Sequence, residues 1–438
     1  MSVFIGYPSF MAYQMMKGKK GNNDGFPSIP GMIARYSALD LTNEQMAENP
    51  VWKDLTGNGH DLQMKNFAWK EGSGISDIYP GALVFDGVDD YGICNNFPIL
   101  TKEKGYTVVA LRQYLFNATD KIRSLVTNAP RSIVSRSTLT FELIGSNGAK
   151  TNFSFGRGNL VSDFEPNVFS YMTSKSYNGK TITPGDVTES NKRILVGNFS
   201  ENGEYGSNVA IWELVFLDHD ATEEELTKIK DYFVKTYPWL FPDQAWTVVG
   251  KTNEDEDRAT IANITGNGND LVLSNFGFIE GSGYNEEGEY AGYLVTDGVD
   301  DKAVSKQFKF GENFTVILDF KFPVKKIAYC GFDLSSKVRI RNLQGSGVYV
   351  VLKGNKTLIP SNVVRAVTSE GKVYDENWNE YNIVPGNISS NYTMVNLGFD
   401  GSNQFAESAT KLAGIYSSAL SKDDCIKAYN YLQTLKAK

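Results

Sequence analysis

The chain contains the stretch Asp54-Leu-Thr-Gly-Asn-Gly-His-Asp-Leu62, followed by Leu83-Val-Phe-Asp-Gly-Val-Asp-Asp90. Both return later, as Asn263-Ile-Thr-Gly-Asn-Gly-Asn-Asp-Leu271 and Leu294-Val-Thr-Asp-Gly-Val-Asp-Asp301. The order of turn residues and apolar positions is the same in both copies, which is hard to produce by chance in unrelated segments. The 438-residue sequence therefore predicts two copies of one domain.

Each copy has the pattern of a β-sandwich. The Gly-Asn-Gly segments at 57–59 and 266–268 accept positive φ at low cost, so they predict tight turns that enter strands. Apolar and polar residues alternate over 314–322, as in a strand with one buried face. Turn clusters recur about every ten residues, which is typical of sandwiches.

The two copies also end alike. Residues 209–217 and 411–416 are predicted strands, and each precedes a predicted helix, at 222–236 and 421–435. An apolar stripe on each helix indicates that it packs on its own domain. Cys425 lies on the second stripe, so we expect a core residue and not a reactive thiol.

Composition excludes several classes of protein. A net charge of −8 argues against a nucleic-acid partner, because phosphate binding needs clustered Lys and Arg. No stretch reaches the ~18 apolar residues of a membrane span, so no membrane insertion is expected. With only two histidines, histidine-rich metal sites and most histidine-dependent catalysis are excluded. The three cysteines are far apart and suggest neither a disulfide framework nor a zinc site.

We divide the chain into an N-terminal arm at 1–30, domain 1 at 31–237, a connector rich in Pro and aromatic residues at 238–244, and domain 2 at 245–438. The arm has no counterpart before the second copy. It is either a docking segment that becomes ordered on a partner or a tail packed on its own domain. Its lysines follow the first apolar residues instead of preceding them, so no secretory signal peptide is expected.

The segment Asp-Leu-Thr-Gly-Asn-Gly-His-Asp at 54–61, with Phe-Asp-Gly-Val-Asp-Asp-Tyr at 85–91, resembles the laminin-G-like domains of the concanavalin A-like lectin/glucanase superfamily. The resemblance covers nearly the whole chain. It implies an all-β fold of two tandem concanavalin A-like jelly-roll β-sandwiches, each ending in a short α-helix, behind an N-terminal extension. Such domains serve as lectins, adhesins, glycosidases and virion components, so the fold does not fix the function.

A second resemblance rests on Thr-Asn-Glu at 42–44, Thr-Gly-Asn-Gly at 56–59 and Asn-Phe-Ala-Trp at 66–69. This combination looks like repeats in virion proteins of tailed phages that infect gut Bacteroidales, including crAss-like phages. It implies a protein that is synthesised in the host cytoplasm and becomes part of the virion. The missing secretory signal agrees with that expectation.

Each copy has three clustered aspartates that could offer oxygen ligands to Ca²⁺, namely Asp86, Asp89 and Asp90, and Asp297, Asp300 and Asp301. In the alternative interpretation, the first aspartate shapes a turn and the others cap backbone amides at a strand end. The spacing is not that of an EF-hand loop, and the second interpretation is favoured. No other cofactor is implied.

Two tryptophans are candidate sugar-stacking residues, because an aromatic face packs well on the apolar face of a pyranose. Trp69 has an aromatic counterpart, Phe278, in the second copy, which favours a core role. Trp378 lies in the polar segment 374–380 and ranks first among possible ligand contacts. The Glu-x-Asp-x-Glu strand motif of retaining glucanases is absent from the sequence, so no catalytic residues are expected.

The sequence thus predicts a non-enzymatic virion structural protein of a tailed phage, such as a fibre or appendage of the head or tail. Residues 1–30 would anchor it to other virion proteins, the chain would form a homo-oligomer, and loops of one domain would bind a host surface glycan. The alternatives are a tail ring or connector protein and a free carbohydrate-binding lectin.

Overall fold

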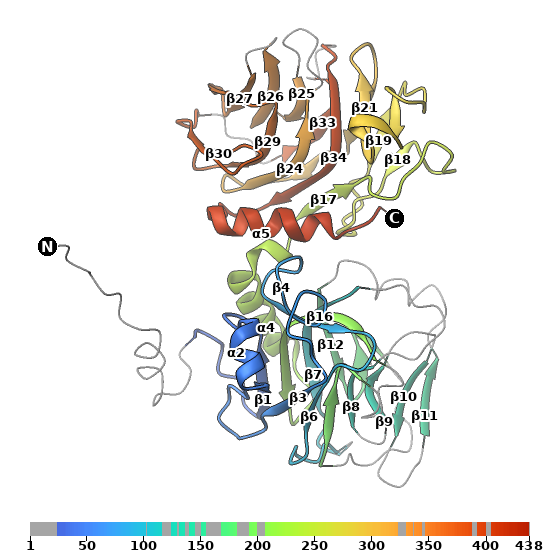
Figure 1. The fold of residues 1–438 in the computed structure, drawn as a ribbon, viewed down its shortest axis with the longest axis vertical. Helices are drawn as coiled ribbons and strands as arrows, with labels where there is room; N and C mark the ends of the chain where they lie inside the picture. The colour runs from blue at the N-terminus through green and yellow to red at the C-terminus, as the bar shows by residue number, and fades with distance from the viewer. Residues whose placement is uncertain are drawn as a thin grey trace, which may run out of the picture. The chain divides into compact units, whose positions relative to one another are not determined.

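The structure, a computed structural model, describes residues 24–101, 103–115, 124–128, 131–135, 140–144, 150–154, 168–181, 192–198, 206–322, 330–335, 337–343, 347–387, 392–399 and 404–437. The first 23 residues of the predicted arm lie outside these ranges. The chain divides into two compact units, and the change from domain 1 to domain 2 falls between Lys235 and Thr236 (Figure 1).

Domain 1 consists of two antiparallel sheets. The first has the order β14-β13-β12-β7-β16-β5-β4, with β1 also paired to β16. Its strands are β1 (Met32–Ser37), β4 (Gly74–Ser76), β5 (Ala82–Asp86), β7 (Thr107–Tyr114), β12 (Phe169–Thr173), β13 (Ser176–Tyr177), β14 (Lys180–Thr181) and β16 (Asn208–Leu217). The second has the order β2-β3-β6-β15-β8-β9. Its strands are β2 (Val51–Trp52), β3 (Leu62–Lys65), β6 (Tyr91–Cys94), β8 (Ser124–Asn128), β9 (Arg131–Ser135) and β15 (Ile194–Val196), while β10 (Thr140–Ile144) and β11 (Lys150–Ser154) pair separately.

Domain 2 repeats this plan. Its first sheet has the order β20-β21-β34-β24-β29-β30-β31, with β17 paired to β34. These strands are β17 (Gln244–Thr247), β20 (Gly283–Asn285), β21 (Tyr293–Asp297), β24 (Thr315–Lys321), β29 (Val363–Thr368), β30 (Lys372–Tyr374), β31 (Glu380–Asn382) and β34 (Glu407–Tyr416). The second sheet has the order β18-β19-β22-β33-β25-β26-β27-β28. It comprises β18 (Thr260–Ile261), β19 (Leu271–Ser274), β22 (Lys302–Ser305), β25 (Cys330–Leu334), β26 (Val338–Leu343), β27 (Gly347–Leu352), β28 (Asn355–Ile359) and β33 (Val395–Leu397); β23 (Phe308–Lys309) pairs with β32 (Tyr392–Thr393).

The predicted all-β class, with two sandwiches that each end in a helix, is confirmed. The helix α4 (Glu223–Thr236) follows β16, and α5 (Lys422–Gln433) follows β34. The shorter helical segments are α2 (Asn43–Glu48), η2 (Pro238–Leu240) and η3 (Gly288–Tyr290). Within the ranges given above, no helix combines the length and apolar character needed to cross a membrane.

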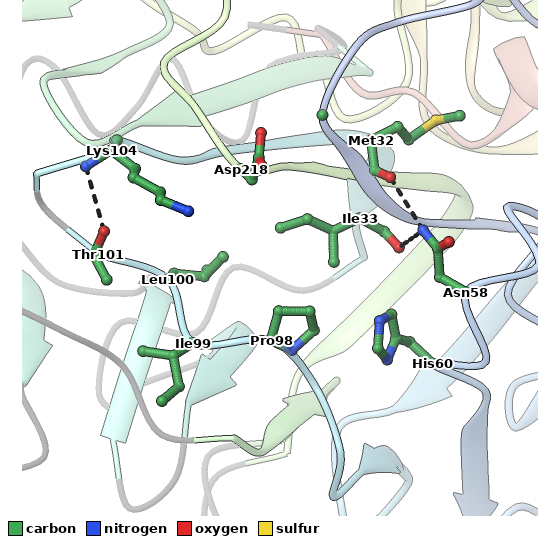
Figure 2. A pocket seen from close by; sticks show the side chains of 12 residues that line it. Met32, Ile33, Asn58, His60, Pro98, Ile99, Leu100, Thr101, Lys104 and Asp218 are labelled. Carbon is green, nitrogen blue, oxygen red and sulfur yellow. Dashed lines mark hydrogen bonds between the residues drawn. The ribbon is translucent and has the colours of Figure 1, made fainter.

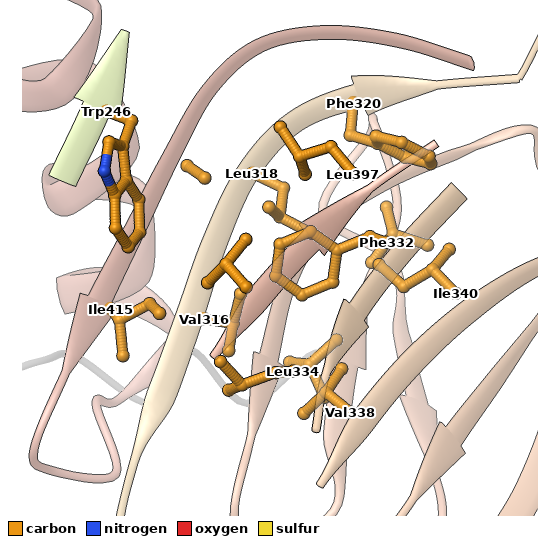
Figure 3. Packing of buried hydrophobic residues seen from close by; sticks show 14 of the residues in the cluster. Trp246, Val316, Leu318, Phe320, Phe332, Leu334, Val338, Ile340, Leu397 and Ile415 are labelled. Atoms are coloured by element: carbon orange, nitrogen blue, oxygen red, sulfur yellow. The ribbon is translucent and has the colours of Figure 1, made fainter. Parts of the chain in front are cut away.

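The core of each domain lies between its two sheets. In domain 2, Val316, Leu318 and Phe320 of β24 meet Phe332 of β25 and Leu397 of β33, all buried (Figure 3). The alternation predicted for 314–322 therefore faces this core. The three cysteines are free and buried.

The helix α5 packs closely on the outer face of its sheet. Ser421 caps it by accepting a hydrogen bond from the backbone N–H of Asp424. A Cβ on Gly414 of β34 would come within 2.5 Å of Leu432 Cδ1. Glycine at this position therefore lets the helix approach the strand.

The repeated polar motifs hold strand edges in place. Asn43 donates to the carbonyl of Ile75 and accepts from its N–H, both at 2.8 Å, and so binds the edge strand β4. Asn253 makes the same pair of bonds to Tyr284 of β20. The Thr-Asn-Glu motif thus supplies an asparagine that satisfies an exposed strand edge.

Residues 24–30, which the sequence assigns to the arm, contact domain 1. Asp24 accepts a hydrogen bond from Arg35 at 2.5 Å, and the Phe26 ring lies 4.1 Å from the Arg35 guanidinium. Arg35 also forms a buried, bidentate pair with Glu213 of β16. This part of the arm is therefore packed on its own domain.

Replacing Phe216 by Ala should lower the free energy of unfolding by about 3–5 kcal/mol, the usual cost of truncating a buried Phe. The Phe216 ring is fully buried against Tyr36 and Phe97. Urea denaturation measures the change. Val88→Ala, at a side chain that is 64% exposed, is the control and should shift it by less than about 0.5 kcal/mol; equal losses would contradict the packing.

Candidate functional site

In both domains, the first aspartate of the repeated Asp-Gly-Val-Asp-Asp segment shapes a turn. Asp86 Oδ1 accepts hydrogen bonds from the N–H groups of Val88, at 2.7 Å, and Asp89, at 3.4 Å. Asp297 makes the same two contacts, at 2.8 and 3.4 Å. These bonds are those of an Asx turn.

The last aspartate of each segment is buried. Asp90 accepts from the N–H of Asp86 at 3.0 Å and from the hydroxyl of Ser73 at 3.1 Å. Asp301 accepts from the N–H of Asp297 at 2.9 Å. Burial raises the pKa of Asp90 to about 7 and that of Asp301 to about 6, since loss of water disfavours the charged form.

The three carboxylates of each cluster come together. One oxygen from each of Asp86, Asp89 and Asp90 lies within 4.8 Å of the others, and the second cluster has the same arrangement. Oxygens of the first and last aspartates are engaged by backbone and hydroxyl donors, so part of the set already serves the turn. The remaining oxygens, with the middle aspartate, are of the type that Ca²⁺ prefers, and a cation would offset the repulsion among the three charges.

Replacing Asp90 by Asn should make stability less dependent on pH. The folded-state pKa of Asp90 lies above its ordinary value, so its proton stabilises the fold fully below about pH 4. That contribution is lost as the pH rises to about 7. The free energy of unfolding of the variant, measured by urea denaturation between pH 4 and 7, should therefore fall less than that of the original protein.

Asp231→Asn, the same change on an exposed side chain of α4, is the matched control and should keep the original slope. An unchanged slope in the Asp90 variant would contradict the role of this buried carboxyl. Adding CaCl₂ at pH 7 tests the cation, which would stabilise the original protein more than the variant.

The structure places Trp69 against the core of domain 1. Its ring stacks on Phe67 with a centroid distance of 4.8 Å, and it is half-buried. Phe278 takes the same place in domain 2 and packs beside Phe276. Both residues have φ 51°, so the aromatic belongs to a repeated turn of both domains.

Trp378 lies in the turn between β30 and β31, and Asp375 organises this turn. The Asp375 carboxylate accepts hydrogen bonds from the N–H of Asn377, the N–H and side chain of Asn379, and the hydroxyl of Tyr381, at 2.9–3.0 Å. Although burial opposes its charge, these bonds lower the pKa of Asp375. The turn thus closes around a buried carboxylate anion.

The turn holds Trp378 at φ 61°, a conformation that bulky residues rarely adopt. Its ring meets Tyr429 of α5 edge-on, at 5.8 Å between centroids, and lies 6.1 Å from Tyr374. Trp378 is consequently half-buried, where the sequence suggested a more exposed side chain.

A buried network fixes Tyr429 itself. Asp319, on β24, accepts hydrogen bonds from the hydroxyls of Tyr293 and Tyr429, at 2.8 and 3.2 Å, and from the Gln433 amide, at 2.8 Å. It also pairs with Arg365, whose guanidinium lies 4.7 Å from the centre of the Tyr429 ring. The surface on which Trp378 rests is therefore rigid.

Sequence reasoning missed a cavity of about 280 Å³ in domain 1. It lies among the start of β1, the turn that holds Asn58 and His60, the loop after β6 and the segment that follows β16 (Figure 2). Its wall is apolar at Ile33, Pro98 and Ile99. Four separate segments form it, so no local pattern could have predicted it.

No protein-family model matches the chain, and no curated protein matches it. Among solved structures, the ligand binding domain of botulinum neurotoxin serotype D in complex with N-acetylneuraminic acid aligns with 90% of this chain and 97% of its own, at 10% identity and a TM-score of 0.38. The receptor binding domain of a botulinum neurotoxin C/D mosaic serotype has the same coverage and identity, with a TM-score of 0.37.

Trypanosoma rangeli sialidase aligns with 66% of this chain, at 8% identity and a TM-score of 0.32. The chain spans 52% of the sialidase, about half its length. Identities and TM-scores this low transfer no function to the chain. The resemblance to phage virion proteins stays a prediction from the sequence.

Proposed function

We propose that this protein is a non-enzymatic structural protein of a tailed phage particle and that domain 2 binds a host surface glycan at the turn around Asp375. The observation that carries the binding proposal is the conformation of Trp378, an aromatic residue held at positive φ by a carboxylate with four hydrogen bonds. Such a conformation costs about 1–3 kcal/mol and persists only where its surroundings impose it.

Closure of the hairpin does not require this turn. In domain 1, the equivalent strands β13 and β14 are joined by the two residues Asn178 and Gly179, both at positive φ. Domain 2 uses five residues, 375–379, between β30 and β31. The extra residues of the domain 2 turn are therefore not needed to connect the two strands, and they carry Trp378.

The chemistry of the turn suits a sugar ring. The accessible part of the Trp378 indole offers an apolar face, and its two neighbours in the sequence, Asn377 and Asn379, are exposed polar residues. A rigid aromatic with polar groups beside it is the common arrangement of small-ligand sites. Because Asp375, Tyr374 and Tyr429 fix the indole before binding, little side-chain entropy is lost on contact.

Two features support the proposal that the protein belongs to a phage particle. The repeats resemble phage virion proteins in sequence, and the chain consists of two tandem β-sandwiches whose repeated turns hold neighbouring strands together. Residues 24–30 are packed on domain 1 through Asp24 and Phe26. We therefore propose residues 1–23 as the segment that anchors the chain to partner proteins.

Trp378→Ala should abolish binding of the full chain to the surface polysaccharides of Bacteroidales on a glycan array, because the stacking surface is removed. Trp378→Phe should retain part of the signal. Val384→Ala, at a side chain that is 78% exposed, is the control and should bind normally. Equal signals from the Ala variant and the original protein would exclude this turn as the site.

A variant that lacks residues 1–23 tests the particle assignment. The solution mass of the full chain should correspond to a defined homo-oligomer, and the truncated variant should be a monomer that no longer associates with particle proteins. If the full chain and the truncated variant are both monomers that do not associate with particle proteins, a free lectin is favoured. A ring of higher symmetry would favour the connector alternative over a fibre.

A further inference from the structure

We propose that the cavity of domain 1 is a second binding site, which takes one acidic sugar residue and contacts its carboxylate through Lys104. The site lies in domain 1, whereas Trp378 lies in domain 2, so the site does not depend on the turn at 375–379. It is lined by Ile33, His60, Pro98, Ile99 and Lys104, among others (Figure 2).

A longer loop in domain 1 forms the cavity. Ile93 and Val304 hold equivalent places in β6 and β22, and four residues later Phe97 corresponds to Phe308. At the other end of the loop, Tyr106 and Phe314 accept the same hydrogen bond, from Ser174 and Ser369. Tyr106 follows Phe97 by nine positions, whereas Phe314 follows Phe308 by six.

The longer loop supplies one side of the cavity. Ile99, Leu100, Thr101 and Lys104 all line it. Ile99 is 41% exposed at its edge, so part of its side chain is open to a ligand. The additional residues thus help to form this concave surface.

The repeats keep the frame of this region but change its lining. Asn58 donates to the carbonyl of Ile33 at 2.9 Å, and Asn267 donates to the equivalent carbonyl of Asp243 at 2.6 Å. His60, in contrast, is replaced by Asn269. Lys104, two residues before Tyr106, is replaced by Glu312, two residues before Phe314. The charge at this position is therefore positive in domain 1 and negative in domain 2, although the surrounding hydrogen bonds are similar.

The lining determines the class of ligand. The Lys104 side chain points into the space between Leu100 and Asp218, and its ammonium forms no ion pair with a described residue (Figure 2). Ile33 and Pro98 offer an apolar wall to a sugar ring. The Asn58 amide oxygen and the His60 imidazole are polar groups that suit the hydroxyls of that sugar. The volume, just below the ~300 Å³ at which small-molecule sites begin, suits one sugar residue.

Asp218, the carboxylate among the described residues that line the cavity, has a partner of its own. Asp218 Oδ1 lies 3.3 Å from Nδ1 of His219. Burial lowers the pKa of His219, but its hydrogen bonds to Glu225 and Asp218 outweigh this effect and raise it. Asp218 therefore has a partner other than Lys104, whose ammonium can attract an anionic group.

The experiment compares methyl glycosides of galacturonic, glucuronic and N-acetylneuraminic acid with methyl galactoside and methyl glucoside. Binding to the full chain carrying Trp378→Ala, which removes the domain 2 platform, is measured by isothermal titration calorimetry. At least one acidic glycoside should bind in preference to the neutral ones. Lys104→Gln should weaken that binding about ten-fold or more, the loss of one charge-assisted hydrogen bond.

Lys70→Gln, at an exposed lysine elsewhere in domain 1, is the matched control and should leave the affinity unchanged. Ile99→Glu, at the exposed edge of the cavity, should repel the acid without disturbing the core. The proposal is overturned if no acidic glycoside binds at a concentration of about 10 mM. It is also overturned if neutral and acidic sugars bind equally, or if the Lys104→Gln variant binds as tightly as the control. Since the tested variant lacks the Trp378 indole, these outcomes are separate from failure of the domain 2 site.

Discussion

In each domain, one ten-residue strand pairs with three others and is buried almost throughout. On one side β16 pairs with β7, and on the other it pairs first with β5 and then with β1. In domain 2, β34 pairs with β24, β21 and β17 in the same way. Strands far apart in the sequence share one hydrogen-bonding partner, so the sheet can form only after these long-range contacts are made.

This dependence explains which parts of the repeat are constant. The Thr-Gly-Asn-Gly turn and the Asp-Gly-Val-Asp-Asp turn hold the strands beside β16 and β34 in register, through bonds such as those of Asn58 and Asp86. Loops outside this frame differ in length between the copies. Both proposed sites lie in such loops: the five-residue turn that carries Trp378 and the longer loop that carries Lys104. A constant scaffold with divergent loops is how sandwich domains acquire separate binding functions.

The fold could be predicted because its signals are local and occur twice. Alternation over 314–322, the Gly-Asn-Gly turns and the strand followed by a capped helix each reflect a backbone requirement visible in a few residues. The helix α2 was not predicted, since its six residues depend on a capping box between Thr42 and Gln45 that the second copy replaces with turns. The aspartate clusters and the turn that their first residue shapes could be found because the residues adjoin in sequence, but the burial of Asp90 and Asp301 could not.

The candidate sites were less predictable. Trp378 was singled out by its polar surroundings, yet its contact with Tyr429 joins residues about fifty positions apart, and its positive φ has no sequence signature. Crystals of the full chain soaked with the sugar that binds it best would show whether the ligand lies on Trp378. We expect density for a sugar ring stacked on Trp378, within hydrogen-bonding distance of Asn377 or Asn379. Density for that sugar elsewhere on domain 2, with the Trp378 indole uncovered, would contradict this expectation.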